Sequence, residues 1–160
     1  MNVIKNEKIE MLNRFVQNTD VHIFLTGKAG TGKTTFLRNL AVNTYKRMVI
    51  VAPTGVAAIN AGGVTIHSFF QLPFGPIVPD TGTVSRSLPV TGLNAQKINK
   101  TKLKIMRSLD LLVIDEISMV RADLLDAIDA VLRKVRHSSA AFGGVQLLMI
   151  GDIQQLAPVA

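Results

Sequence analysis

The segment that most restricts the fold of this 160-residue chain is a glycine-rich octapeptide, Gly27-Lys-Ala-Gly-Thr-Gly-Lys33-Thr34. It fits the pattern G-x-x-x-x-G-K-[ST], follows an apolar run at 21–26 and precedes residues 32–45, whose apolar side chains recur at helical spacing. Between a strand and a helix, such glycines let backbone N–H groups converge on phosphate oxygens at the positive end of the helix. The octapeptide therefore predicts a phosphate-binding loop in an α/β fold.

The residue types in this loop match the parts of a nucleoside triphosphate. The Lys33 ammonium, which we count among the catalytic groups, is expected to reach the β and γ phosphates, and the Thr34 hydroxyl is expected to bind Mg²⁺. ATP and Mg²⁺ are therefore the expected cofactors. The residues predicted to bind the nucleotide are Gly27, Ala29, Gly30, Thr31, Gly32, Lys33, Thr34 and Thr35.

The remaining apolar pattern predicts a mainly parallel sheet flanked by helices. Expected strands are 21–26, 48–52, 111–114 and 146–150, and expected helices are 4–18, 32–45, 55–61, 94–109 and about 121–137. Apolar strands separated by helices indicate a parallel sheet buried on both faces with right-handed crossovers. We expect an N-terminal helix in 1–20, one α/β domain in 21–160 and, within it, a long Pro- and Gly-rich loop at 73–92 that is either functional or mobile. In the helix at 94–109 the inward residues should be Ile98, Ile105, Met106 and Leu109.

The composition excludes several classes of protein. Apolar residues make up 48% and charged residues 18%, so disordered and collagen-like chains are excluded. No apolar run approaches the roughly 20 residues of a bilayer span, and no cysteine is present for disulfides, zinc binding or thiol catalysis. We expect a soluble, intracellular protein without a membrane partner, cytoplasmic in a bacterium and nuclear or mitochondrial in a eukaryote.

Positive charge gathers in the middle of the chain. Residues 21–109 carry eleven Lys or Arg and one acid, Asp80, whereas residues 110–160 carry more acids than bases. A basic segment of this kind suits a polyanion, but it is equally typical of a solvated surface. The same two alternatives apply to the bases from Lys97 to Arg107, which the predicted helix turns outward.

A pair of carboxylates ends the third predicted strand. Asp115 and Glu116 follow the apolar run 111–114, which places them at the carboxyl edge of the sheet, where open α/β sheets bind ligands. Asp115 is expected to hold Mg²⁺ through water, and Glu116 to orient and help deprotonate an attacking water. Asp-Glu after a strand is also an ordinary helix start, so the assignment depends on the neighbouring phosphate loop.

A third candidate group follows the fourth strand, in Gly151-Asp-Ile-Gln-Gln155-Leu. If the fourth strand neighbours the first, as in other phosphate-loop proteins, the Gln155 amide can sense the γ phosphate and counts as a catalytic residue. Asp152 can equally cap a turn.

Taken together, these motifs resemble superfamily 1 DNA helicases of the Pif type (petite integration frequency), which are related to RecD and TraA. The resemblance covers nearly all of 21–159. It is carried most strongly by the block 51–70, Val-Ala-Pro-Thr-Gly-Val-Ala-Ala-Ile-Asn-Ala-Gly-Gly-Val-Thr-Ile-His-Ser-Phe-Phe, and by the later blocks 115–119, 133–146 and 151–156. It implies a RecA-like phosphate-loop domain, the first of two in such motors. The activity it implies is ATP-driven 5′-to-3′ movement on single-stranded DNA with unwinding of duplex or forked DNA.

The resemblance also implies DNA contacts and a missing glutamine. The implied DNA-binding residues are Pro53, Thr54, Gly55, His67 and Phe69. An exposed ring can stack on a base, although Phe69 and Phe70 are equally typical of core packing and His67 of a helix start. The family's adenine-recognising upstream glutamine has no clear match, because Gln17 lies too near the first strand.

The length conflicts with a complete motor of this family. The arginines that stabilise the transferring phosphate come from a second RecA-like domain, so the chain resembles a fragment truncated at Ala160 and should bind Mg-ATP weakly, hydrolyse it slowly and leave DNA wound. We expect a monomer that needs this second domain as a partner. The alternatives are a stand-alone nucleotide-dependent DNA-binding or regulatory module, which has no need of Glu116, and a nucleotide kinase, whose acceptor lid would hold more arginines than the single Arg86 of the 73–92 loop.

Overall fold

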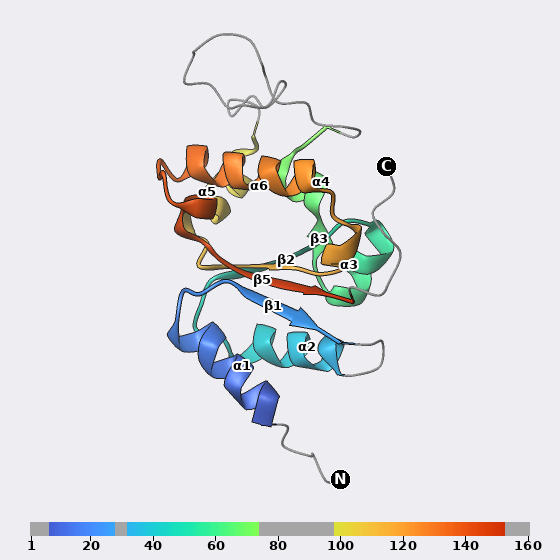
Figure 1. The fold of residues 1–160 in the computed structure, drawn as a ribbon. Coiled ribbons are helices and arrows are strands. Elements are labelled where there is room, and N and C mark those ends of the chain that lie inside the picture. Colours follow the sequence, from blue (N-terminus) through green and yellow to red (C-terminus); the bar gives the residue numbers. More distant parts are fainter. Residues whose placement is uncertain (1–6, 28–31, 74–97, 153–160) are drawn as a thin grey trace.

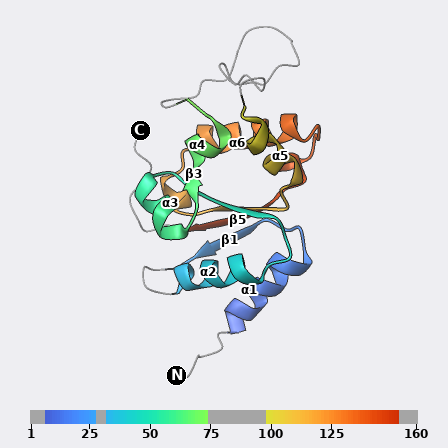
Figure 2. The ribbon, with the colours of Figure 1, turned by 180° about the vertical axis from the view of Figure 1, so that it is seen from behind.

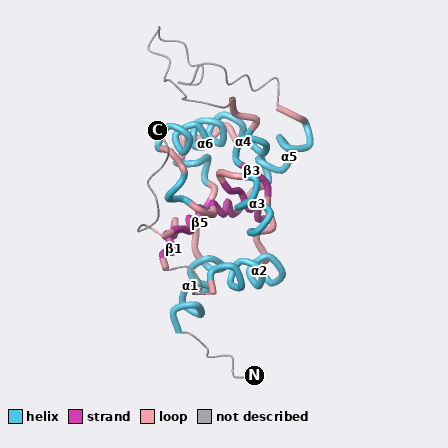
Figure 3. The backbone as a smooth tube through the Cα atoms, turned by 90° about the vertical axis from the view of Figure 1, so that its right-hand side faces the viewer, coloured by secondary structure: helices cyan, strands magenta, loops and turns pink. Residues whose placement is uncertain are grey.

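A computed structural model describes residues 7–27, 32–73 and 98–152, and it shows a parallel sheet between two layers of helices (Figures 1 and 3). In chain order the elements are α1 (Glu7–Asn18), β1 (Ile23–Thr26), α2 (Lys33–Asn43), β2 (Met48–Ala52), α3 (Gly55–Ala61), β3 (Val64–Thr65), α4 (Ile66–Phe70), α5 (Lys100–Ser108), β4 (Leu111–Ile114), the 3-10 turn η2 (Ile117–Met119), α6 (Ala122–Val135), the 3-10 turn η3 (Ala141–Gly144) and β5 (Gln146–Gly151). The expected α/β fold class is confirmed. None of the helices in these ranges is long and apolar enough to cross a membrane.

The five strands lie in the order β1-β5-β4-β2-β3, and every neighbouring pair is parallel. β4 is buried along its whole length, as expected for an apolar strand with helices on both sides. β1 is one of the two edge strands, and its residues alternate between half-buried and exposed, with Phe24 46% exposed. The expectation that every strand is buried on both faces was therefore wrong for β1, because one of its faces lacks a covering helix among the described residues.

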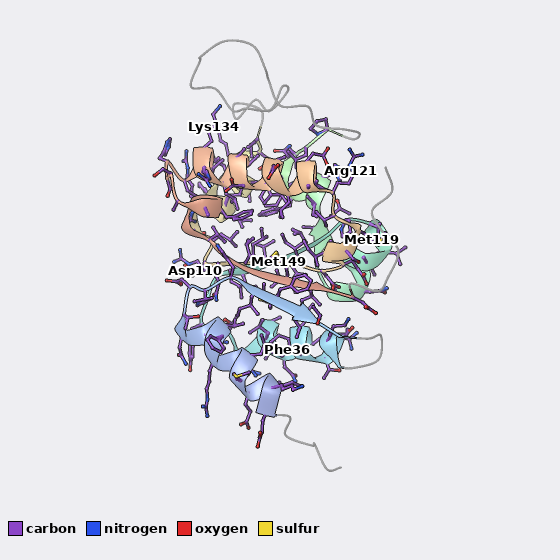
Figure 4. All side chains as sticks on the ribbon, viewed as in Figure 1. Phe36, Asp110, Met119, Arg121, Lys134 and Met149 are labelled. Atoms are coloured by element: carbon purple, nitrogen blue, oxygen red, sulfur yellow. The ribbon has the colours of Figure 1, made fainter. Side chains whose placement is uncertain are left out.

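Two separate apolar cores hold the layers together. One core lies between the sheet and α4, α5 and α6, and Met149 packs against it; the other lies between the sheet and α1 and α2, and contains Phe36 (Figure 4). The view from behind shows the same division of helices (Figure 2). Ile105, expected inside, is 38% exposed. Leu103 packs against the core in its place, since Leu103 and Met106 lie three residues apart on one helix face and Ile105 lies about 100° round the helix from Met106.

The segment 62–70, for which no element was predicted, forms a tight turn, β3 and α4. Gly62 adopts the left-handed conformation that ends α3, with φ of 76°. Gly63 then passes so close to β2 that a Cβ there would lie 2.2 Å from the Ile50 carbonyl oxygen. The Thr65 hydroxyl accepts a hydrogen bond from the Ser68 N–H (3.2 Å) and begins α4. The two glycines thus let the chain return beside β2 within a few residues.

The block 133–146, which supports the family resemblance, is structural here. The Arg136 guanidinium donates hydrogen bonds to the Gly143 carbonyl (2.8 Å) and to the last carbonyls of α5, those of Met106, Arg107 and Leu109 (2.9 Å each). A positive charge at a helix C-terminus is favourable. Asp129 accepts from the Phe142 N–H (2.6 Å), and a Cβ at Gly143 would lie 2.6 Å from the Leu132 carbonyl oxygen. These contacts fasten η3 onto α6.

Candidate functional site

The candidate site lies at the carboxyl edge of the sheet, where the parallel strands all end (Figure 1). Thr26 of β1 pairs with Gly151 of β5, and Ile114 of β4 pairs with Val51 of β2. The segments that follow these four strands therefore emerge in the order β1, β5, β4, β2. The fold brings together the ends of the phosphate loop, the carboxylate pair and the Pro53-Thr54-Gly55 segment, as the motifs required.

The described ends of the phosphate loop face each other. Gly32 adopts a left-handed conformation (φ 89°, ψ 11°) directly before α2. The Lys33 ammonium donates a hydrogen bond to the Gly27 carbonyl oxygen across the loop. No described side chain caps the α2 N-terminus, and Thr34 and Thr35 are exposed on its first turn. Ala29, Gly30 and Thr31 lie outside the described residues, as does Gln155.

Asp115 lies close to Lys33. Its carboxylate accepts a hydrogen bond from the Glu116 N–H (2.9 Å), and its own N–H donates to the Val51 carbonyl (2.9 Å). Burial raises the pKa of Asp115 above its usual value, while the Glu116 hydrogen bond and the charge of Lys33 act in the opposite direction. A partly buried carboxylate beside a lysine is a candidate functional group.

Glu116 stands in a backbone conformation that is unusual for its residue type. Its φ of 52° and ψ of 44° fall in the left-handed region, which costs a residue with a Cβ about 1–2 kcal/mol. This conformation turns the chain sharply from β4 into η2. The strained backbone therefore belongs to Glu116, one of the two acidic residues that the sequence predicts at the site.

The oxygen donors near the site suit Mg²⁺. Asp115 supplies a carboxylate and Thr34 a hydroxyl, which are hard ligands of the kind that Mg²⁺ uses together with water and phosphate oxygens. Within 7–27, 32–73 and 98–152, no group of three or more His, Asp or Glu side chains forms a cage for a metal ion. Asp115 and Thr34 are therefore residues at this site whose oxygen atoms fit Mg²⁺.

The turn η2 contains a site-edge residue that the sequence did not reveal, Ser118. Its hydroxyl oxygen is buried, and no protein group within hydrogen-bonding distance pairs with it. η2 packs against the end of β5, where a Cβ at Gly151 would lie 2.8 Å from Ile117 Cγ2 and 3.3 Å from Ser118 N. Nothing in the sequence distinguishes this serine from an exposed one.

The candidate DNA-binding residues fall into two groups. Thr54 and Gly55 are exposed and Pro53 is half-buried, and the Thr54 hydroxyl accepts a hydrogen bond from the Ala57 N–H (3.2 Å). His67 is half-buried on α4. Phe69, by contrast, is only 4% exposed and packs edge-on against Phe70, which is fully buried, with ring centroids 4.9 Å apart. The core-packing alternative thus describes both phenylalanines in this structure, and Phe69 offers no exposed ring face to a base.

Two bases of α5 donate hydrogen bonds to backbone carbonyls of neighbouring helices. Lys102 donates to the Ser68 carbonyl of α4 (2.6 Å), and Arg107 donates to the Val135 carbonyl at the end of α6 (3.3 Å). Lys100 and Lys104 are exposed. Helix capping therefore accounts for two of these bases, and Lys97 lies outside the described residues.

An apolar cavity of about 480 Å³ opens beside the phosphate loop. It is lined by Lys8, Ile9, Met11, Leu12 and Phe15 of α1, by Ile23, Leu25, Thr26 and Gly27 at β1, and by Gly32, Lys33 and Phe36 at α2. Gln17 is not one of the residues that line the cavity, and its side-chain oxygen accepts a hydrogen bond from the Thr44 hydroxyl (3.1 Å).

Comparisons with known proteins agree with the motifs. A sequence model described as PIF1-like helicase matches residues 4–160. The chain is 41% identical over 141 residues to the ATP-dependent DNA helicase PIF1 of Homo sapiens, a match that covers 86% of this chain and 20% of the human protein.

Two solved structures are similar along nearly the whole chain. A structure described as DNA unwinding at forked dsDNA by two coordinating Pif1 helicases has a TM-score of 0.86 and 46% identity, with 99% of this chain and 36% of that chain covered. A Bacteroides Pif1 in complex with ADP-AlF4 has a TM-score of 0.86 and 45% identity, with 99% and 34% covered. The chain thus spans about a fifth of the human relative and about a third of these solved chains.

Proposed function

Since the chain belongs to the PIF1-like helicase family, we propose that it forms the first RecA-like motor domain of an ATP-dependent 5′-to-3′ DNA helicase. Such a motor couples ATP hydrolysis to movement along single-stranded DNA and to unwinding of duplex or forked DNA in genome maintenance. The single observation that carries the proposal is that Lys33 follows β1 and Asp115 follows β4 at the same carboxyl edge of the parallel sheet. This is the charge pair that nucleotide and metal binding require at a phosphate loop.

The site residues divide the chemistry among them. The free N–H groups of the α2 first turn and the phosphate loop bind the phosphates, and Lys33 moves from the Gly27 carbonyl to the β and γ phosphates. Thr34 and Asp115 hold Mg²⁺, which neutralises charge on the phosphates when it is bound. Glu116 orients the attacking water and takes its proton, and Gln155 contacts the γ phosphate.

The apolar cavity beside the loop is the place for the nucleotide base. It is bordered by Gly27 and Lys33 on one side and by α1 on the other, so a base attached to phosphates at the loop can reach it. The aliphatic and aromatic side chains that line it can pack on a planar ring without reading its edges. Binding by packing alone agrees with the position of Gln17, which is occupied by Thr44.

DNA binding belongs to the neighbouring end of β2. Thr54 and Gly55 are exposed there, and His67 lies on α4, close along the chain to β3. The Val51 carbonyl, two residues before Pro53, accepts the Asp115 N–H, so the pairing of β2 with β4 continues to the residue that follows β4. This pairing connects the metal-binding carboxylate with the segment proposed to contact DNA.

The isolated chain is an incomplete motor. It spans about a third of the solved chains, and the arginines that stabilise the transferring phosphate belong to a second RecA-like domain, its expected partner. Removing such an arginine costs about 10³–10⁵ in rate. The chain alone should therefore behave as a monomer that binds Mg-ATP, hydrolyses it slowly and does not unwind DNA. Its place is the bacterial cytoplasm, or the nucleus or mitochondrion of a eukaryote.

DNA-stimulated turnover and fork unwinding test this proposal. The chain alone should show slow turnover and no unwinding, whereas joining it to the second motor domain of a relative should restore both. Robust unwinding by the chain alone would contradict the need for that domain. If Glu116→Gln left the slow turnover of the chain unchanged, the alternative of a stand-alone nucleotide-dependent DNA-binding or regulatory module without translocation would be favoured instead.

A further inference from the structure

The turn after the carboxylate pair hides a hydroxyl that the proposed chemistry does not use. Ser118 Oγ is buried and has no protein partner, and no other buried side-chain nitrogen or oxygen in 7–27, 32–73 and 98–152 shares this condition. Three other hydroxyls of the described residues are paired: Thr54 and Thr65 cap helices, and Ser108 donates to the Ile105 carbonyl (3.2 Å). A buried hydroxyl without a partner destabilises the fold, so its presence needs a reason.

The position of Ser118 connects two parts of the candidate site. Glu116 directly precedes η2, and the Met119 and Val120 N–H groups donate to the Glu116 and Ile117 carbonyls (3.0 Å each), which closes the turn. The same turn packs on the end of β5 at Gly151, where a Cβ would lie 2.8 Å from the Ile117 side chain and 3.3 Å from the Ser118 backbone nitrogen. Ser118 therefore stands between the water-activating carboxylate and the strand that leads toward Gln155.

A hydroxyl in this position is suited to a partner that is not part of the protein. The turn is closed by its own backbone hydrogen bonds, and the Ser118 hydroxyl has no partner in the protein. A nucleotide bound at the neighbouring phosphate loop brings phosphate oxygens and water into this edge of the sheet, and both are good partners for a hydroxyl.

We propose that Ser118 is a positioning residue of the nucleotide-bound state: its hydroxyl pairs with the phosphate-bound water network and thereby fixes η2 and Glu116 in register with the nucleotide. The inference rests on the proposed function. It predicts that one side chain has opposite effects in two states. Without nucleotide, the unpaired hydroxyl destabilises the chain; with nucleotide, its hydrogen bond stabilises the complex.

The test compares Ser118→Ala with Ser108→Ala, whose hydroxyl is half-buried, paired and on α5, away from the site. Thermal unfolding is measured without nucleotide and with Mg²⁺ and the non-hydrolysable analogue AMP-PNP. Without nucleotide, Ser118→Ala should unfold about 2–4 °C higher than the wild type. Its apparent Kd for Mg-AMP-PNP should be about tenfold weaker, so the rise on adding the analogue should be smaller. Ser108→Ala should unfold no higher than the wild type and keep the full rise.

The conservative variant adds a check on the hydrogen bond itself. Ser118→Cys keeps nearly the same volume with a weaker donor, so its Kd should fall between those of the wild type and the alanine variant. A Ser118→Ala protein that unfolds lower than the wild type, or that keeps the wild-type Kd for Mg-AMP-PNP, would overturn the inference. A wild-type chain whose unfolding does not respond to Mg-AMP-PNP would instead refute the proposed nucleotide binding, and the inference with it.

Discussion

Relieving the backbone strain at Glu116 should stabilise the protein while abolishing its chemistry. Glu116 holds φ at 52°, and a residue with a Cβ spends about 1–2 kcal/mol in this region, whereas glycine enters it without steric cost. Glycine also loses more backbone freedom on folding, which offsets about 0.5–1 kcal/mol. The expected net gain for Glu116→Gly is therefore about 0.5–1 kcal/mol, which corresponds to roughly 1–4 °C in a domain of this size.

Glu116→Gln separates strain from charge. Glutamine keeps the Cβ and the strained conformation but removes the carboxylate, so its unfolding temperature should stay close to that of the wild type. Both variants should lose ATP turnover, because neither can accept a proton from water. Urea unfolding of the three proteins, followed by circular dichroism, supplies the free energies of unfolding. A Glu116→Gly variant no more stable than Glu116→Gln would refute the reasoning that strain is stored at this residue.

Two further substitutions follow from burial and from close contact. Burial raises the pKa of Asp115, so the folded state holds the proton of this carboxyl more tightly and loses stability as pH rises above the usual value of 3.8. Asp115→Asn should therefore stabilise the chain at pH 7, with a gain that shrinks toward pH 4. The same variant should lose Mg²⁺-dependent nucleotide binding. Thermal unfolding at several pH values checks this, and a gain that grows on acidification contradicts it. Gly63→Ala should lower the free energy of unfolding, measured in urea, by about 2–3 kcal/mol, because its Cβ would lie 2.2 Å from a backbone oxygen of β2. Gly55→Ala is the control, because a Cβ there would have no atom within 4 Å and should not lower stability. Equal effects of the two substitutions would contradict the account of the β2–β3 turn.

The sequence predicted the sheet well because its strands are short apolar runs. Strands 48–52 and 111–114 and the helix 55–61 begin and end in the structure where they were expected, and β1 does pair with β5 as the phosphate-loop comparison required. α5 begins at Lys100, later than expected, although 94–97 lie outside the described residues. The spacing of apolar residues predicts the bounds of these elements because a buried strand or helix face requires apolar side chains at regular positions.

The sequence did not predict features that depend on a single tertiary contact. β3 has two residues and no detectable period, and it exists because Gly63 fits against β2. Lys102 was expected to point outward, but in the structure it donates a hydrogen bond to the Ser68 carbonyl of α4. Phe69 could stack on a base or fill the core, and only the packing around it decides.

The candidate site shows the same limit. The motif placed Lys33 and Asp115 at one edge of the sheet, and the structure brings them close enough for the charge of Lys33 to act on Asp115. The motif could not predict the left-handed conformation of Glu116 or the unpaired hydroxyl of Ser118, because both arise from the way η2 packs on β5. The residue types predicted which groups form the candidate site, but they did not predict the backbone conformation and packing that position those groups.

The central claim is that this chain binds Mg-ATP through its phosphate loop, and titration of a fluorescent ATP analogue tests it most directly. Lys33→Ala is compared with Lys134→Ala, an exposed lysine near the C-terminal end of α6, which lies on the opposite side of the sheet from α2 (Figures 1 and 4). Loss of a charged hydrogen bond worth about 1.5–3 kcal/mol should weaken binding by at least tenfold in Lys33→Ala and leave Lys134→Ala unchanged. Equal affinity in all three proteins, or no Mg²⁺-dependent binding by the wild type, would contradict the account.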